Sequence, residues 1–231
     1  MEALTDEQLK AITSKHPQIL LIAGPGTGKT TTLTNAIIHK VKVLNTPEYR
    51  IQAFTFTNKA TREMIRRIAS VLGEHNVGIS TFHAYTFKYL KEYHNLNLKI
   101  VDDFMKREII KNLILERKYD NFLKVEECVL EISHLKNEMN LKEERLYKRL
   151  RIIEIYYAYE EYLKTNNKVD FDGMNLEFLN LLKNDESFRE IIIDEFDYIF
   201  VDEAQDINNI QYEILKYLTL KCNHLFMVGD P

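Results

Sequence analysis

The sequence predicts an α/β protein in which a parallel sheet is flanked by helices and interrupted by an all-α insertion. Three observations lead to this prediction. Apolar, β-prone runs alternate with helical patterns toward both ends of the chain, as in doubly wound sheets. A glycine-rich segment, residues 23–30, stands between one such run and the next helix. The middle of the chain, from Asp102 to about Lys164, carries helical patterns alone.

Local signals mark the first helix and the first strand. Thr5, with Gln8 three residues later, forms a capping box that predicts a helix over residues 6–14. Pro17 ends that helix, and the apolar run that follows it predicts a strand near residues 18–23.

The same alternation continues along the chain. Residues 51–56 predict a second strand, and Asn58 is expected to cap a helix that runs through Leu72 and ends at Gly73. The later predicted elements are a strand over residues 77–81, a helix over 82–93, and strands near 198–202 and 224–228.

The middle of the chain predicts a helical insertion. We expect a discontinuous domain made of residues 1–98 and 168–231, with residues 99–167 as the insertion subdomain. A tyrosine cluster at residues 156–162 could stack nucleic-acid bases, but packing in or beside the core is preferred. Two apolar stripes are expected to face the core: Ile109, Ile110, Leu113 and Ile114, and then Leu146, Leu150, Ile153, Tyr157 and Leu163.

Residues 23–30, Ala-Gly-Pro-Gly-Thr-Gly-Lys-Thr, have the sequence and the setting of a phosphate-binding loop (P-loop). An apolar run precedes them, and a helix-like stretch from Thr31 to Leu44 follows, whose amino terminus adds partial positive charge. Ala23 stands where the strict pattern has Gly, which is a mild departure because Ala is the next smallest residue. The flanking strand and helix disfavour the alternative of an ordinary glycine-rich turn.

Each residue of this loop has an expected role toward a nucleotide. Lys29 would reach the β- and γ-phosphates of ATP, and the Thr30 hydroxyl would bind Mg²⁺. The candidate cofactor-binding residues of this segment are Ala23, Gly24, Pro25, Gly26, Thr27, Gly28, Lys29, Thr30 and Thr31.

A second part of a nucleotide site follows the β-prone run at residues 198–201. This run predicts a buried strand that carries Asp202 and Glu203 at its carboxyl end, the edge where open α/β sheets bind ligands. Asp202 would hold Mg²⁺, and Glu203 would orient and deprotonate the attacking water. The alternative, a surface acidic turn, is disfavoured by the loop at residues 23–30. The candidate catalytic residues are Lys29, Glu203 and Gln205, and the candidate metal ligands are Thr30 and Asp202.

Composition sets broader limits on function. Cys128 and Cys222 are the only two cysteines and have no metal-site spacing, so a reducing cytoplasm is expected. The amino terminus lacks signal-peptide features and no apolar run approaches membrane-spanning length, so no membrane partner is expected. The formal net charge of −4 gives no global electrostatic case for a nucleic-acid partner.

Seven segments, taken in order, carry a more specific pattern. They are Leu4 to Ile12, Ala23 to Thr30, Ala53 to Met64, Ser80 to His83, Val169 to Met174, Val201 to Asp206, and Val228 to Pro231. In this order they resemble the Q motif, motifs I, Ia and Ib, the Asp-Phe-Asp-Asp-Leu segment, motif II and the opening of motif III of superfamily 1 helicases of the UvrD/Rep/PcrA type.

The resemblance implies a RecA-like first domain of a P-loop NTPase that carries a helical insertion, with ATP and Mg²⁺ as cofactors. It implies that Gln8 reads the adenine edge, and that single-stranded DNA runs past Phe56, Asn58, Thr81 and His83. The residues themselves support this, because a strand-end aromatic beside hydrogen-bond donors suits stacked bases and phosphates. For His83 alone, a buried hydrogen-bonded histidine would be the alternative.

The resemblance also implies an ATP-dependent DNA helicase that translocates 3′→5′ on single strands and meets a duplex junction. The chain reaches Pro231 within the motif III segment, so a second RecA-like domain with arginine fingers is expected in cis, and this part alone is expected not to unwind DNA. The Thr-Phe-Thr-Asn-Lys-Ala and Thr-Phe-His segments disfavour RNA-directed superfamily 1 members and AAA+ ATPases. A stand-alone P-loop nucleotide-binding or interaction module without turnover stays open.

Overall fold

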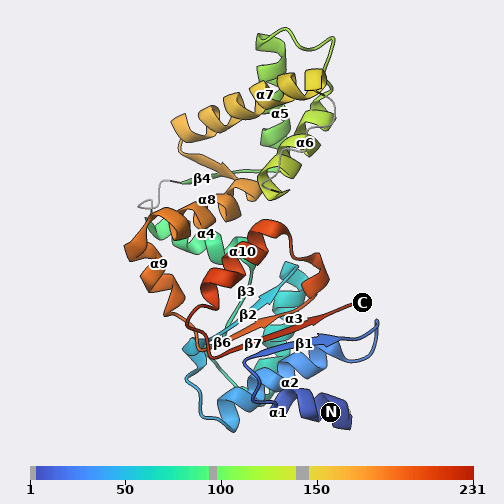
Figure 1. Cartoon of the computed structure of the whole chain (residues 1–231), viewed down its shortest axis with the longest axis vertical. Coiled ribbons are helices and arrows are strands. Elements are labelled where there is room, and N and C mark those ends of the chain that lie inside the picture. Colours follow the sequence, from blue (N-terminus) through green and yellow to red (C-terminus); the bar gives the residue numbers. More distant parts are fainter. Residues whose placement is uncertain (1–3, 94–97, 139–145) are drawn as a thin grey trace. The chain divides into compact units, whose positions relative to one another are not determined.

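We describe the chain from a computed structural model that covers residues 4–93, 98–138 and 146–231. Figure 1 labels most of its helices and strands, which are numbered in chain order. Within these ranges, no helix is both long enough and apolar enough to cross a membrane.

The chain divides into two compact units. The first comprises the chain up to Tyr85 together with Leu181–Ile207 and Gln211–Pro231, and the second comprises Thr86–Asn180 and Asn208–Ile210. The first unit therefore contains both segments of the candidate nucleotide site.

The second unit is longer than the helical insertion expected at residues 99–167. The reason is that parts of two flanking helices belong to it. In α4 (Phe82–Tyr93), the ring of Tyr89 lies 6.1 Å from the ring of Phe178 in α8 (Phe171–Asn184). The domain boundaries given above stay a prediction.

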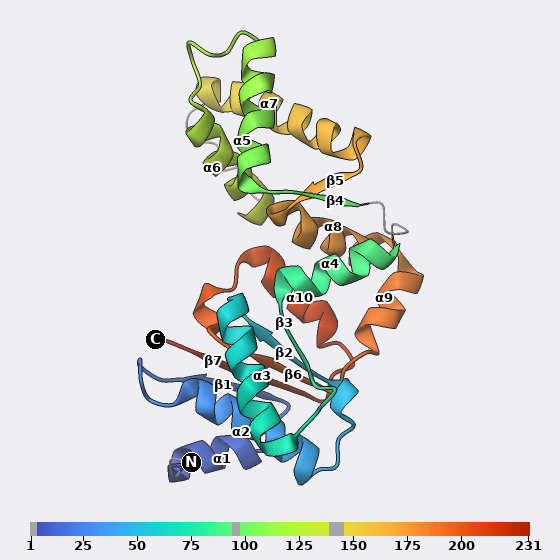
Figure 2. The same ribbon diagram turned by 180° about the vertical axis from the view of Figure 1, so that it is seen from behind.

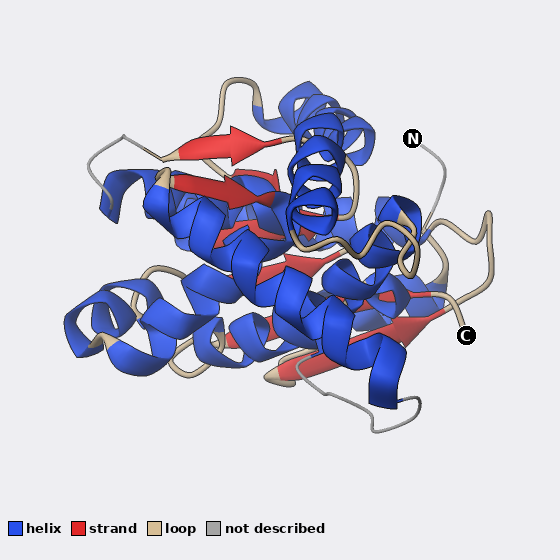
Figure 3. Cartoon of the chain, turned by 90° about the horizontal axis from the view of Figure 1, so that it is seen from above, coloured by secondary structure: helices blue, strands red, loops and turns tan. Residues whose placement is uncertain are grey.

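A five-stranded sheet forms the centre of the first unit, and all of its neighbouring strands are parallel. The register places Leu21 opposite Val228 and Phe54 opposite Val201. The predicted parallel α/β sheet is confirmed, and Figure 3 shows its strands in red. The strands, in their spatial order, are β1 (Gln18–Ile22), β7 (His224–Gly229), β6 (Tyr198–Val201), β2 (Ile51–Thr55) and β3 (Gly78–Thr81).

Helices lie on both faces of this sheet. The chain moves from β1 to β2 and on to β3 through α2 and α3, and then returns from β6 to β7 through α10. Right-handed crossovers that run in opposite directions along a sheet lie on opposite faces of it. Helices α2 and α3 therefore cover one face and α10 covers the other, as Figures 1 and 2 show. The helices and 3₁₀ turns of this unit are α1 (Asp6–Thr13), α2 (Lys29–Lys42), η1 (Glu48–Arg50), α3 (Asn58–Leu72), α9 (Glu186–Ile193), η2 (Ala204–Asp206) and α10 (Asn209–Leu218).

The core between the sheet and α2 and α3 fixes the strand ends. Leu33 and Ile37 of α2 and Met64 of α3 are fully buried against Phe200 and Phe226 of the two central strands. Burying side chains of this size stabilises the fold by about 1.5–3 kcal/mol each. The loops that follow the strands are therefore held on a rigid frame.

Capping explains where the first helices begin. The capping box is confirmed: the Thr5 amide donates to Gln8 Oε1 at 2.9 Å, and the Gln8 amide donates to Thr5 Oγ1 at 3.3 Å. The expected cap of α3 was wrong by one residue. Thr57, in extended conformation, accepts a hydrogen bond from the Ala60 amide at 3.1 Å, and Asn58 is the first helical residue.

The second unit contains three helices that pack around one apolar core, together with a two-stranded parallel sheet. The insertion at residues 99–167 was expected to be all-α, and this was wrong at its first three residues, which form strand β4. Both strands of this sheet have three residues, too few to show a period-two pattern in the sequence. The additional elements are β4 (Lys99–Val101), α5 (Asp103–Glu116), α6 (Val125–Glu138), α7 (Leu146–Thr165) and β5 (Lys168–Asp170).

The buried faces of α5 and α7 test the two predicted stripes. The α5 stripe is confirmed, since all four of its residues are buried. The α7 stripe was wrong in part, because Leu150 and Tyr157 are 49% and 63% exposed, whereas Leu163 is buried as expected. The side chain of Leu146 lies outside the described residues. The other buried residues in the described part of α7 are Ile152, Ile155, Ala158 and Tyr159.

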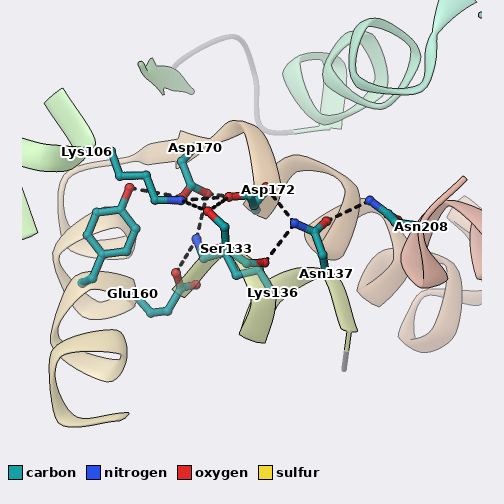
Figure 4. A network of polar contacts seen from close by, with 10 residues as sticks. Lys106, Ser133, Lys136, Asn137, Glu160, Asp170, Asp172 and Asn208 are labelled. Atoms are coloured by element: carbon teal, nitrogen blue, oxygen red, sulfur yellow. Dashed lines mark hydrogen bonds and ion pairs between the residues drawn. The ribbon is translucent and has the colours of Figure 1, made fainter. Parts of the chain in front are cut away.

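A buried polar network connects the elements of the second unit (Figure 4). Lys136, fully buried, forms ion pairs with Asp170 at 2.7 Å and Glu160 at 2.6 Å. Lys106 forms ion pairs with Asp170 at 3.1 Å and Asp172 at 2.8 Å. Burial would raise the pKa of Asp170, but the two ammonium groups outweigh it and hold the pKa below its ordinary value.

Candidate nucleotide-binding site

The carboxyl ends of three adjacent strands meet at one edge of the sheet. β1 leads into the loop at residues 23–30, β7 ends beside Asp230, and β6 leads into Asp202. The Ala23 amide donates to Gly229 O at 3.1 Å, which extends the pairing of β1 and β7 past the strand ends. Side chains that are far apart in the sequence therefore meet here, as expected for an open α/β sheet.

The loop owes its shape to two glycines with left-handed backbone, Gly26 at φ 75° and Gly28 at φ 85°. A Cβ atom on Gly28 would lie 2.9 Å from Gln8 Nε2, so a larger residue there would displace that amide from the loop. Gln8 Nε2 donates to Thr27 O at 3.2 Å, which brings the predicted adenine-reading amide against the loop.

Helix α2 begins at Lys29, within the last residues of the loop segment, and has no side-chain cap. An uncapped amino terminus leaves backbone N–H groups and the positive end of the helix dipole available to an anion. Thr31, also predicted to bind the cofactor, lies in this first turn, and its hydroxyl accepts a hydrogen bond from Arg67 Nη1 at 3.2 Å. The loop and the helix terminus together suit a phosphate chain.

Lys29 is folded back onto the loop. Its ammonium group donates to Ala23 O at 2.9 Å and Gly24 O at 3.1 Å, and it forms an ion pair with Asp230 Oδ1. Only 9% of the side chain is exposed. The sequence assigned no role to Asp230, although its position after an apolar strand-like run was a signal that its carboxylate would reach this edge.

Thr30 and Asp202 meet as a metal site requires. Thr30 Oγ1 lies 3.2 Å from Asp202 Oδ2, and neighbouring ligands of an octahedral Mg²⁺ with bonds near 2.1 Å are about 3 Å apart. Hydroxyl and carboxylate oxygens are ligands that Mg²⁺ prefers. Burial, and then the charge of Glu203, raise the pKa of Asp202 above its ordinary value.

Glu203 is held in place by its neighbours. Its backbone is left-handed, at φ 50°, and its amide donates to Asp202 Oδ1 at 3.1 Å. Gln205 Nε2 donates to Glu203 Oε2 at 2.9 Å, while Gln205 Oε1 accepts from the Asp230 amide at 2.9 Å. Gly229 permits this approach, because a Cβ there would lie 2.8 Å from Gln205 Oε1. Gln205 thus connects the Glu203 side chain to the backbone that follows β7.

Three of the predicted DNA-binding residues line one small hollow. The hollow, of about 70 Å³, is bordered by Phe56, Thr81 and His83 and also by Asp202 and Glu203. Phe56 follows the end of β2 and is 56% exposed, so its ring is available for contact. The fourth predicted residue, Asn58, does not border the hollow and starts α3.

Comparison with known proteins agrees with this architecture. The family model described as the UvrD/REP helicase N-terminal domain matches residues 4–231. The chain is 33% identical to ATP-dependent DNA helicase PcrA of Leuconostoc citreum, over 98% of this chain and 32% of that protein. It is 32% identical to a probable DNA helicase II homolog of Mycoplasma capricolum, over 100% of this chain and 34% of that protein.

A third relative, ATP-dependent DNA helicase PcrA of Staphylococcus aureus, is 32% identical over 98% of this chain and 33% of that protein. The chain thus spans about a third of the length of the curated relatives it matches. On the family match across residues 4–231, the chain belongs to the UvrD/REP helicase N-terminal domain family.

Proposed function

We propose that this chain is the ATP-binding part of an ATP-dependent DNA helicase. The observation that carries the proposal is the approach of the Thr30 hydroxyl to the Asp202 carboxylate, beside Lys29 and beside Glu203. A phosphate-binding loop alone would suit many anions. A loop, a metal-binding pair and an adjacent carboxylate together suit a nucleoside triphosphate that is to be hydrolysed.

Different residues of the site would contact the phosphates, the adenine and the Mg²⁺ of Mg-ATP. Gly24 and residues 26–28 offer backbone N–H groups to the phosphates, Lys29 offers a positive charge, and Gln8 offers its amide to the adenine. Thr30 and Asp202 would hold Mg²⁺, which when bound neutralises phosphate charge. Thr31 extends the phosphate contacts into the first turn of α2.

Catalysis would depend on Glu203, with Gln205 as its support. Glu203 is the carboxylate next to the metal-binding pair, so it is the group placed to orient water and accept its proton. The hydrogen bond from Gln205 Nε2 holds the Glu203 side chain in position. Lys29 would stabilise negative charge that develops on the transferred phosphate.

Single-stranded DNA is the proposed partner at the hollow beside this site. Phe56 offers an aromatic face for base stacking, and Thr81, His83 and Asn58 offer hydrogen bonds to bases and phosphates. Because the hollow also borders Glu203, DNA bound there would lie next to the candidate base. Translocation 3′→5′ along the strand toward a duplex junction rests on the family resemblance, and a cytoplasmic location rests on the two cysteines without metal-site spacing.

Full activity would need more than this chain. The relatives are about three times as long, and a second RecA-like domain in such a protein would close the ATP site with arginine fingers. We propose that residues 1–98 and 168–231 form the first such domain, with residues 99–167 inserted in it. By itself the chain would bind Mg-ATP but turn it over very slowly and unwind no DNA.

The test replaces Glu203 in the full-length protein. Glu203→Gln should leave Mg-ATP affinity unchanged and lower the DNA-stimulated hydrolysis rate by about 10²–10⁴, the usual contribution of a general base. The control is Glu213→Gln, at a half-buried residue of α10 whose carboxylate pairs with Lys216 at 2.8 Å; it should hydrolyse ATP at the wild-type rate. Equal hydrolysis rates for Glu203→Gln and wild type would show that another group is the general base. A wild-type protein that binds ATP without hydrolysing it would favour the stand-alone binding module.

A further inference from the structure

The ammonium group of Lys29 has no donor left for a ligand in this structure. An ammonium group has three N–H donors. Its three acceptors are Ala23 O, Gly24 O and Asp230 Oδ1, and only 9% of the side chain is exposed. A phosphate can reach Lys29 only if it displaces one of these oxygens.

Asp230 is the acceptor that a phosphate would displace most readily. Its side chain is 36% exposed, so water can solvate the carboxylate once it leaves. The other two acceptors are backbone carbonyls of the loop itself and cannot leave without changing its shape. An incoming phosphate is also negatively charged and repels the carboxylate, whereas it does not repel the carbonyls in the same way.

The backbone of Asp230 is fixed while its side chain can turn. The Asp230 amide donates to Gln205 Oε1, and the preceding Gly229 accepts from the Ala23 amide. Among the residues that the structure describes, Lys29 is the only cation within ion-pair distance of Asp230. A change of side-chain rotamer therefore suffices to break the pair without moving β7.

We propose that Asp230 is an internal anion that holds Lys29 in the absence of nucleotide and gives way to a nucleotide phosphate. The pair contributes to the stability of the fold and competes with the ligand for the same ammonium group. This inference rests on the proposed function, because it requires a phosphate that binds at Lys29. It adds a positioning residue that sets nucleotide affinity without itself touching the nucleotide.

The test is Asp230→Asn in this chain, which keeps the size of the side chain and removes its charge. Titration calorimetry with Mg-ADP and Mg-ATP should show affinity about fivefold higher than wild type, the order expected for a partly exposed ion pair. Without nucleotide, the same variant should unfold at a lower temperature than wild type. A residue with a merely structural role would lower both quantities, so the opposite signs identify the competition.

Two controls isolate the pair. Asp206→Asn removes an exposed carboxylate in the nearby η2 and should change affinity by much less, which measures the effect of net charge alone. In a Lys29→Ala background, Asp230→Asn should give no gain in affinity. Asp230→Ser provides a second variant should the Asn form fold poorly.

The outcomes separate the inference from the proposed function. Nucleotide affinity in Asp230→Asn and Asp230→Ser that is equal to or below wild type overturns the role of Asp230 while the proposed function stands. If wild type and both variants bind no nucleotide, the proposed function fails and the inference fails with it. If Asp230→Asn gains affinity even without Lys29, the carboxylate acts through another group and the inference is wrong.

Discussion

At the residue scale, two basic side chains are buried far from the candidate site. His224, at the start of β7, is 4% exposed, and neither of its ring nitrogens has a hydrogen-bond partner among the residues that the structure describes. Lys40 of α2 is 3% exposed, and its ammonium lies 5.1 Å from the centre of the Tyr198 ring. Burial, and then the charge of Lys40, lower the pKa of His224 to about 4.

This lowered pKa predicts a pH dependence of stability. In the unfolded chain a histidine takes up a proton below a pKa of about 6.5, whereas folded His224 stays neutral down to about 4. The unfolded state therefore binds more protons in this window. The free energy of unfolding should be highest above about pH 6.5 and should fall by about 3 kcal/mol as the pH drops to about 4.

Denaturant unfolding at a series of pH values measures this fall. His224→Phe should flatten the curve between these two pH values, because it removes the buried titrating group. His16→Gln, at an exposed histidine, should keep the slope of the parent. A slope unchanged in His224→Phe would assign the acid sensitivity to other groups.

At the scale of single elements, the sheet and its loops followed from local signals, while other features did not. A capping box, a strand-like run and a glycine-rich loop each involve residues that are close together in the sequence, so they could be predicted from it. The face of α7 was not readable, because apolar residues occur all around the helix at positions 152–159. The Lys29–Asp230 pair was not readable either, because it joins residues 201 positions apart across adjacent strands.

The buried network of α6 and β5 predicts a large effect from one substitution. Lys136→Met keeps the shape of the side chain but leaves Asp170 and Glu160 without their shared cation. Breaking a buried ion pair by removing one partner lowers the free energy of unfolding by about 3–5 kcal/mol. Chemical denaturation of the chain measures this loss.

The control for this substitution is Lys111→Met in α5. Lys111 is 53% exposed and pairs with Glu108 only at 3.8 Å, so its loss should cost within about 0.5 kcal/mol. If Lys136→Met proves as mild as Lys111→Met, Lys106 alone compensates the carboxylates and the network contributes little to stability.

At the scale of the whole molecule, the net charge of −4 means that the DNA proposed as a partner would have to be bound by local groups. The strand β2 offers a matched comparison, because an exposed aromatic stands near each of its ends. Phe56 follows its carboxyl end at the candidate site and is 56% exposed. Tyr49, in η1 before its amino end, is 68% exposed.

In the full-length protein, Phe56→Ala should weaken binding to a labelled single strand by roughly 1–3 kcal/mol, the contribution of one stacked base. Tyr49→Ala should leave the affinity unchanged, since it lies at the opposite edge of the sheet. Fluorescence anisotropy at two salt concentrations measures both. A larger loss for Tyr49→Ala would place the DNA path away from the carboxyl ends of the strands.

The central claim is that the edge formed by the loop at residues 23–30 and by Asp202 binds Mg-ATP, and titration calorimetry of this chain tests it most directly. Lys29→Ala should weaken binding by about 1.5–3 kcal/mol, because it removes a charge-assisted contact to phosphate. Lys42→Ala, at the other end of α2, should bind as wild type does. Equal affinities for wild type and Lys29→Ala would contradict the assignment of this edge as a nucleotide site.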